Sequence, residues 1–315
     1  MNRGSIEKVC RQFGKSRQAY YQLEKRRIRS GVEEEMVLMY VRGIRARQPR
    51  IGTRKLHCML SSVFEENDIK IGRDKLFALL KGNGLLVKPR RRNKITTDSG
   101  HAYRKYPNLI REYVPCEPDQ IWASDITYVS TAQGFVYVSL VTDQYSKKIM
   151  GYHVHQTLEA KGPLKALKMA MRNRCHNETN LIHHSDRGIQ YCCEEYVNLL
   201  KHNKIQISMS APGNPYENAV AERVNGIFKN EFYLDSNFSS IKHVSRTLKE
   251  TVAVYNNHRP HASCDYLTPE QAHHQYGLLK KRWKTYKSPP QKYLVSEEVK
   301  TVLNQLIKKC HLNLS

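Results

Sequence analysis

The stretch that most constrains the fold of this chain runs from Leu181 to Lys229. It opens with a short apolar run that ends abruptly in His183-His184-Ser185-Asp186-Arg187-Gly188. This pattern predicts a buried strand that delivers Asp186 to a tight glycine turn at its carboxyl end. Because sites in α/β proteins are commonly built at the carboxyl ends of strands, Asp186 is a candidate site residue.

The second half of this stretch has the features of a helix start. Asn214 is a suitable N-cap, Pro215 suits the first helical position, and Glu217 occupies the capping-box position. We therefore expect a helix over residues 215–234. Polar side chains at i, i+4, i+7 and i+11 then share one helix face, and apolar ones pack inward. The polar set is Asn218, Glu222, Asn225 and Lys229, and the apolar set is Ala219, Val220, Val224 and Ile227. A carboxylate beside an amide, with a lysine two turns further on, indicates a metal ligand backed by a phosphate contact.

A second candidate carboxylate lies upstream. The segment from Gln120 to Val129 alternates, is rich in β-branched and aromatic residues, and carries Asp125 in its middle. Because Asp is disfavoured inside strands and costly to bury unpaired, Asp125 is either salt-bridged or bound to a cation. We expect Asp125, Asp186 and Glu222 to converge at one end of the sheet. Three ionised carboxylates share a small pocket only with cations, and oxygen ligands suit Mg²⁺ or Mn²⁺. Two such ions can drive an in-line displacement at a phosphodiester.

The charge of the chain narrows the class of partner. The 315 residues carry a formal net charge of +23, which indicates a polyanionic partner. Residues 1–110 contain about 26 Lys and Arg against about 10 Asp and Glu, so the excess is concentrated away from the carboxylates. No apolar run approaches the ~20 residues of a membrane span, and the N-terminus lacks a signal-peptide core, so we expect no membrane partner. Eight cysteines without a CxxC pair predict reduced structural thiols, with a zinc site as the alternative.

The N-terminal region has a helical pattern. Residues 5–28 divide into two short helices around Phe13-Gly14-Lys15-Ser16, and the second helix carries Arg17 among other Arg, Gln and Tyr residues. This order predicts a DNA-binding helix-turn-helix, and a basic solvated hairpin is the alternative. A separate amphipathic helix follows over residues 32–44.

A second helix-turn-helix-like unit is expected beyond it. It consists of two helices, around residues 56–60 and 76–80, the latter closed by glycines. The basic run 88–94 follows and contains Arg90, Arg91 and Arg92. We predict that it follows DNA phosphates as part of a linker, and a merely solvated run is the alternative.

From about residue 115 the pattern changes to strands. Strands are predicted at 120–130, 134–142, 148–155, 180–184 and 205–209, and helices at 159–174, 189–201, 215–234 and 241–257. Three meandering strands followed by alternating helices and strands predict an α/β fold with a mixed sheet flanked by helices. A last amphipathic helix is expected from near Ser296, and docking on its own core is favoured over a role in dimerisation.

Four motifs carry a resemblance to a known family: WASDITYV, LIHHSDRGIQY, SMSAPGNPYENAVAE and YNNHRPH. They resemble the integrase-type core of orfB-type bacterial insertion-sequence transposases, in the Asp-Asp-Glu superfamily that includes the retroviral integrases. The resemblance covers residues from about 40 to 275. It implies an RNase H-like catalytic core, preceded here by the basic all-α helix-turn-helix region. It also assigns both catalysis and metal binding, to two Mg²⁺ or Mn²⁺ ions, to Asp125, Asp186 and Glu222.

We accordingly expect four parts in the chain. They are a helical DNA-binding region at 1–95, a linker at 96–115, the catalytic core at 116–278 and a basic extension at 279–315.

The resemblance implies a DNA transposase that binds the terminal inverted repeats of its element, cuts strands to free 3′-hydroxyls and joins them to target DNA. Lys229 matches a family position that touches the DNA end, and Asn218 and Arg223 are further candidates. Arg223 departs from the small or aromatic residue common in relatives, so it either contacts DNA or is solvated. Partners implied are double-stranded DNA, a second copy of the chain and an upstream-frame protein, in the bacterial cytoplasm at the nucleoid.

Two other functions fit the same residues. One is an RNase H-like nuclease that hydrolyses strands without joining them. The other is an inactive copy that survives as a DNA-binding repressor, and the intact acids and Lys229 argue against this one.

Overall fold

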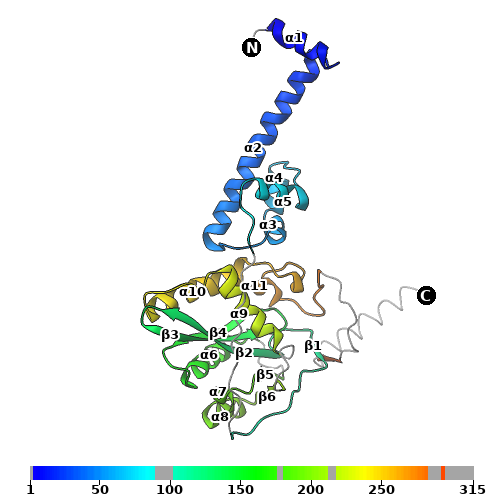
Figure 1. Ribbon diagram of the computed structural model, residues 1–315. Coiled ribbons are helices and arrows are strands. Elements are labelled where there is room, and N and C mark those ends of the chain that lie inside the picture. Colours follow the sequence, from blue (N-terminus) through cyan, green and yellow to red (C-terminus); the bar gives the residue numbers. More distant parts are fainter. Residues whose placement is uncertain (1–2, 89–101, 176–179, 212–217, 283–291, 295–315) are drawn as a thin grey trace, which may run out of the picture. The chain divides into compact units, whose positions relative to one another are not determined.

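The computed structural model describes residues 3–88, 102–175, 180–211, 218–282 and 292–294 (Figure 1). The chain forms two compact units, Met1–Lys88 and Pro89–Ser315. The predicted domain boundary at residue 95 and the candidate residues Arg90, Arg91 and Arg92 lie outside the described residues.

The first unit is helical in all its described elements. Its helices are α1 (Arg3–Gln12), α2 (Arg17–Arg47), α3 (Thr53–Met59), α4 (Ser61–Glu66) and α5 (Arg73–Gly82). Ser16 starts α2, because its side chain accepts a hydrogen bond from the Ala19 N–H at 3.1 Å. A helix carrying Arg17 and a separate helix over residues 32–44 were predicted here, and this was wrong, because α2 is one continuous helix. A single Gly31 costs a helix only ~1 kcal/mol, which is too little to interrupt so many good helix formers.

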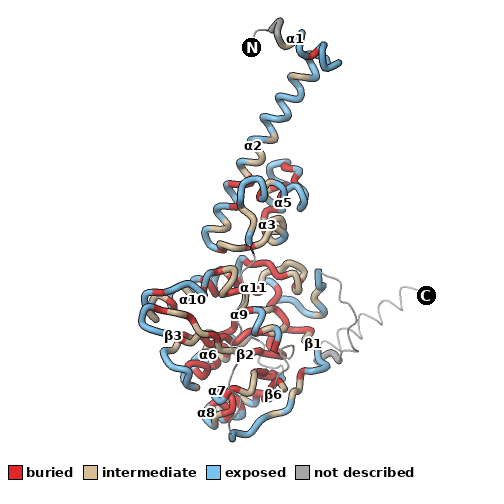
Figure 2. The backbone as a smooth tube through the Cα atoms, in the orientation of Figure 1, coloured by how far each residue is buried: buried red, intermediate tan, exposed pale blue. Residues whose placement is uncertain are grey.

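The core of this unit lies against the C-terminal half of α2. Val37, Leu38 and Val41 pack there with residues of α3 and α5 such as Leu56 and Leu76. The N-terminal half of α2 is exposed along its length (Figure 2). The second helical group has three helices instead of the two predicted, since Leu60 separates α3 from α4.

The second unit is built on a five-stranded mixed sheet. Its strands are β2 (Ile121–Thr131), β3 (Gly134–Asp143), β4 (Ile149–His155), β5 (Ile182–Ser185) and β6 (Gln206–Met209). They lie in the order β4-β3-β2-β5-β6. The first three pair antiparallel, whereas β5 and β6 run parallel to β2. This arrangement confirms the predicted RNase H-like mixed sheet.

Helices cover both faces of the sheet. The helices α6 (Lys161–Arg172), α7 (Ile189–Cys192) and α8 (Glu194–His202) share one core cluster, and α9 (Ala219–Glu231) and α10 (Ile241–His258) share the other. Successive residues of β3 alternate between them, because Leu140 belongs to the second cluster and Val141 to the first. Two short helices follow, the 3₁₀ helix η1 (Ala262–Cys264) and α11 (Pro269–Ala272).

Two helix predictions need correction. The helix expected at 189–201 is two helices, since Cys193 between them is extended, with ψ of 151°. Within the described residues, the helix expected at 215–234 begins only at Ala219, which is therefore exposed instead of packed inward. The predicted cap residues Asn214 and Glu217 lie outside the described residues.

Part of the predicted linker, around Leu109 and Ile110, packs on the sheet. Ile110 contacts Ile121 and Ile182, and the Leu109 N–H donates to Ser208 Oγ at 2.9 Å. The strand β1 (Tyr113–Pro115) pairs in parallel with β7 (Lys292–Leu294) from the C-terminal extension. The helix predicted from Ser296 lies outside the described residues. None of the described helices combines the length and the hydropathy needed to cross a membrane.

Candidate active site

The two aspartates lie at matching positions on neighbouring strands. Strand β5 pairs in parallel with β2, with Ile182 opposite Ile121 and His184 opposite Ala123. Asp125 lies two residues beyond this last pair on β2, and Asp186 lies two residues beyond it on the other side, just after the end of β5. Neighbouring strands are only ~4.8 Å apart, so the register brings the two carboxylates to one edge of the sheet.

Short local hydrogen bonds hold each aspartate. The Ile126 N–H donates to Asp125 Oδ1 at 2.9 Å, and the Gly188 N–H donates to Asp186 Oδ1 at 3.0 Å. The bond from Gly188 to Asp186 lies in the tight turn that was predicted from this glycine. A Cβ at Gly188 would stand 3.0 Å from that carboxylate oxygen, so the turn favours glycine.

Helix α9 lies over Asp125 and is fixed there by amides. Asn225 Nδ2 donates to Asp125 Oδ2 at 2.8 Å, and Asn218 Nδ2 donates to the Ser124 carbonyl at 3.2 Å. Glu222 stands three residues before Asn225, one helical turn away on the same face, and is exposed. The polar face predicted for this helix therefore meets the strand that carries Asp125.

The electrostatics of the site follow from this crowding. Burial, and then the charge of Asp186, raise the pKa of Asp125 to about 7, and the charge of Glu222 adds to the effect. The hydrogen bonds from Asn225 and Ile126 oppose the rise. Burial also raises the pKa of Asp186, against the bond from Gly188. The carboxylates of Asp186 and Glu222 therefore both act on Asp125, and the charge of Lys229, on the same helix as Glu222, interacts favourably with it.

The donor set can be tested against a metal ion. Across the described residues, no group of three or more His, Cys, Asp or Glu side chains has the geometry to hold a metal, so the three carboxylates do not form a closed ligand set in this conformation. The chemistry of the donors nevertheless fits a hard divalent cation, because every candidate ligand is an oxygen. Asn225 Oδ1 and Asn218 Oδ1 are buried there and have no hydrogen-bond partner in the described part of the chain.

The candidate DNA-contacting residues lie in different environments. Asn218 is buried, 5% exposed, and its amide nitrogen is engaged with Ser124, so it faces the protein and not solvent. Lys229 is half-buried, and its Nζ lies 4.2 Å from the centroid of the Tyr128 ring. Burial lowers the pKa of Lys229. Arg223 is exposed.

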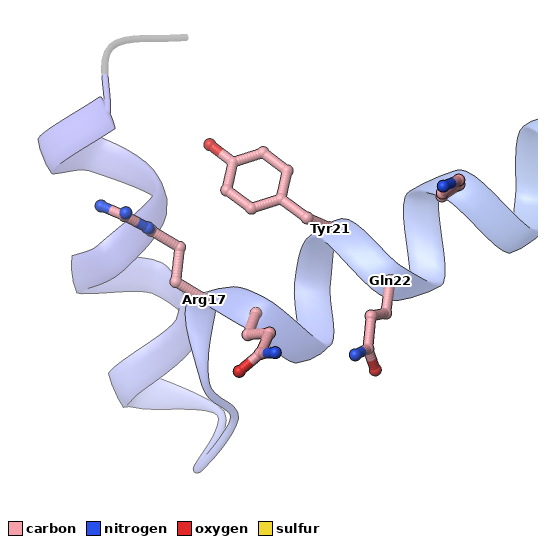
Figure 3. Close-up of a pocket in the computed structure, with 5 residues that line it drawn as sticks. Arg17, Tyr21 and Gln22 are labelled. Atoms are coloured by element: carbon pink, nitrogen blue, oxygen red, sulfur yellow. The ribbon is translucent and has the colours of Figure 1, made fainter.

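In the first unit, the start of α2 presents a polar surface. Arg17, Gln18, Tyr21, Gln22 and Lys25 line an open pocket there (Figure 3). Arg17 and Tyr21 project from the same side of the helix beside α1 (Figure 3). Arg17, Gln18 and Gln22 on this exposed helix end are of the side-chain types that contact nucleic acid.

Two buried polar groups of the second unit were not predicted from the sequence. Nε2 of His183 lies 2.7 Å from Ser124 Oγ and 2.9 Å from the Tyr196 hydroxyl, and burial lowers the pKa of His183 to about 3. This neutral, buried histidine ties β5 to β2 one residue before Asp125. The other group is the ion pair of Arg259 with Glu231 at the end of α9. The only indication of this ion pair in the sequence was Arg259 itself, which is the arginine of the YNNHRPH motif.

Comparisons with known proteins give consistent matches. The family model described as Integrase core domain matches residues 115–215, and a second model of the same description matches residues 203–269. The insertion element IS600 uncharacterized 31 kDa protein of Shigella sonnei is 34% identical over 273 residues, which cover 85% of this chain and 98% of that protein.

Other relatives are named as transposases. The putative transposase for insertion sequence element IS986/IS6110 of Mycobacterium tuberculosis is 31% identical over 73% of this chain and 84% of its own length. Transposase InsF for insertion sequence IS3fB of Escherichia coli is 29% identical over 86% of this chain and 94% of its own length. Among solved structures, the HTLV-2 integrase catalytic core domain in complex with magnesium is 17% identical, covers 50% of this chain and 98% of its own, and has a TM-score of 0.39.

Proposed function

Because the chain belongs to the insertion-sequence transposases that carry an integrase core domain, we propose that it cleaves DNA at the ends of its element and joins the freed 3′-hydroxyls to target DNA. The observation that carries the proposal is the parallel pairing of β2 with β5, which ends two residues before both Asp125 and Asp186, together with the bond from Asn225, on the helix of Glu222, to Asp125. A nuclease and a transposase would share this site, and joining distinguishes them.

The catalytic residues of the proposal are Asp125, Asp186 and Glu222. They would hold Mg²⁺ or Mn²⁺, in two sites, and the ions would activate the attacking oxygen and stabilise the leaving one. The raised pKa of Asp125 supports this role, because a bound cation would offset both the burial and the repulsion from Asp186 that raise it. The magnesium in the HTLV-2 integrase core is consistent with it.

The chain's own groups prepare the site. Asn225 orients Asp125 through the 2.8 Å bond, so this carboxylate keeps one direction as substrate arrives. The Gly188 N–H does the same for Asp186. The buried His183 stays neutral and fixes the strand beside Asp125. None of these groups has to act as a nucleophile, since water or a DNA 3′-hydroxyl attacks.

DNA contacts in the proposal come from two regions. The basic first unit, with Arg17 at the start of α2, binds the terminal inverted repeats, and the run Arg90, Arg91 and Arg92 follows phosphates. Lys229 and Arg223, on the helix of Glu222, contact the cut end. Asn218 keeps a positioning role through Ser124. Two copies hold the two ends, and an upstream-frame protein contributes to end recognition.

A strand-transfer assay with pre-cut element ends and Mg²⁺ tests the proposal. The unmodified chain should produce joined product, and Asp186→Asn and Glu222→Gln should abolish cleavage and joining while leaving end binding nearly unchanged. Glu195→Gln, on the exposed start of α8, is the matched control and should keep full activity. Nicked product without joined product would favour the nuclease. Loss of end binding in both acid variants would mean that the acids hold the fold together.

A further inference from the structure

Helix α2 carries an exposed apolar stripe that the proposed chemistry does not use. Tyr21, Ile28, Val32 and Met39 are 42%, 65%, 61% and 60% exposed. At 3.6 residues per turn, their spacing of seven, four and seven residues places all four within about 40° of one another around the helix. They form one apolar stripe that extends from residue 21 to residue 39 of α2. A stripe of this length differs from the single hydrophobic residues that are common on protein surfaces.

The stripe faces away from the core of its own unit. The buried residues Val37, Leu38 and Val41 lie on the other side of α2, and they hold α3 and α5. The stripe continues into the N-terminal half of α2. There all residues are exposed except Tyr20 and Ser30, which are half-buried (Figure 2). The packing of the first unit therefore leaves this face available.

The sequence of the stripe is that of a coiled-coil seam. Positions 21, 25, 28, 32, 35 and 39 follow one another at intervals of four, three, four, three and four residues, as a and d positions do. The two remaining positions are Lys25 and Glu35, which are both exposed. Neither side chain is paired with another residue in the described part of the first unit.

About residue 30, the apolar positions of the seam are symmetric and the charged positions are opposite in sign. Reading outward from residue 30, Ile28 mirrors Val32, Lys25 mirrors Glu35, and Tyr21 mirrors Met39. Each residue number and that of its mirror add up to 60. A helix with this symmetry is complementary to an antiparallel copy of itself.

We propose that α2 pairs with α2 of a second copy of this chain, antiparallel, about a two-fold axis beside residue 30. Ile28 then packs on the partner's Val32 and Tyr21 on the partner's Met39. Lys25 forms an ion pair with the partner's Glu35, and the symmetry repeats each contact. Such an interface is isologous and closes at two copies. The proposal goes beyond the proposed function, because cleavage and joining do not specify how copies pair.

The charges select this pairing over the parallel one. A parallel pair in register would set Lys25 against the partner's Lys25 and Glu35 against the partner's Glu35, which are repulsive contacts. In the antiparallel pair both charged positions become attractive. Arg26 and Arg27 do not belong to the seam and stay free to contact DNA.

Cross-linking of the full chain tests the geometry. Chains with Tyr21→Cys and Met39→Cys are co-expressed and treated with a short thiol-reactive cross-linker, and the unmodified chain gives the background from its eight cysteines. We expect cross-linked dimers in the mixture and only background for either variant alone, because two copies of position 21 would be about 27 Å apart. Cross-linking of the Tyr21→Cys chain with itself, or none in the mixture, would overturn the proposal.

Charge exchange gives a second, independent test by sedimentation equilibrium. Lys25→Glu and Glu35→Lys should each weaken dimerisation roughly tenfold, because two attractive contacts become repulsive. The double variant should restore it to near the original value. Since both residues are exposed, the far-ultraviolet circular dichroism should not change in any of them. A dimer unaffected by the single changes, or a double variant as weak as either single one, refutes the pairing.

Discussion

The ion pair of Arg259 and Glu231 offers the sharpest test of how the core is held together. Nε and Nη2 of Arg259 each donate to one Glu231 oxygen at 2.8 Å, and the two side chains are 2% and 16% exposed. Nη1 of Arg259 also donates to His261 Nε2 at 2.8 Å. The pair ties the residue after α10 to the end of α9, the helix that carries Glu222.

Loss of one partner removes the nearest opposite charge from the other, buried side chain. A buried pair broken in this way costs about 3–5 kcal/mol, so Arg259→Met and Glu231→Leu should each lower the free energy of unfolding by that amount. The double variant should lose clearly less than the sum, because it buries no isolated charge. Urea unfolding followed by circular dichroism measures all three.

A control exists within the same unit. The pair of Lys161 and Glu159 has an N to O distance of 3.3 Å, and its side chains are 70% and 54% exposed. Because solvent screens it, Lys161→Met should change the free energy of unfolding by less than about 1 kcal/mol. The reasoning is refuted if the Arg259 and Glu231 variants also stay within that range, or if their effects simply add.

Three further predictions concern packing, charge and DNA contact. A Cβ at Gly151 would lie 2.6 Å from the Ala170 backbone N of α6, so Gly151→Ala should lower the free energy of unfolding, measured in urea, by ~3 kcal/mol. Gly226→Ala, in an open helical position, should instead raise it by up to ~1 kcal/mol. Equal effects of the two substitutions would contradict this reading of the packing. The pKa of Asp125 rises from 3.8 to about 7, so without metal the folded state keeps a proton that the unfolded chain loses, and stability falls as pH rises through this window. Asp125→Asn should therefore match the unmodified chain near pH 4 in EDTA and exceed it by on the order of 4 kcal/mol at pH 8, as thermal unfolding would reveal. Lys229→Met should weaken end binding and reduce the slope of log affinity against log salt by about 1 in fluorescence anisotropy, whereas Lys229→Arg should preserve the slope; an unchanged slope in the first variant rules out a phosphate contact.

Local pattern was sufficient for most of the sheet. The alternation around Asp125 and the glycine turn after Asp186 located both strands, because burial on a sheet imposes a period of two and the turn needs a small residue. Errors arose where the boundary depended on weak local energies. Separate helices were expected before residue 28 and from residue 32, where α2 is continuous, and one helix was expected over 189–201, where Cys193 separates α7 from α8.

The partners of the site residues were beyond local pattern. Asn225 was placed on the correct helix face, but its bond to Asp125 joins residues 100 positions apart in the chain. Asn218 was expected to face DNA and is buried against Ser124, because the helix starts close to the sheet. The buried roles of His183 and Arg259 had no periodic signal, since each depends on a single long-range contact.

By itself, the sequence determined the acidic residues, the mixed sheet and the strongly basic character of the chain, because residue type, periodicity and net charge are local or additive properties. Only the tertiary structure decided which side chains meet: the pairing of β2 with β5 that ends just before Asp125 and Asp186, the amide that fixes α9 to Asp125, and the side of α2 that its own core leaves exposed. The physical reason is that contacts between distant segments depend on how whole elements pack, and packing is a property of the assembled chain.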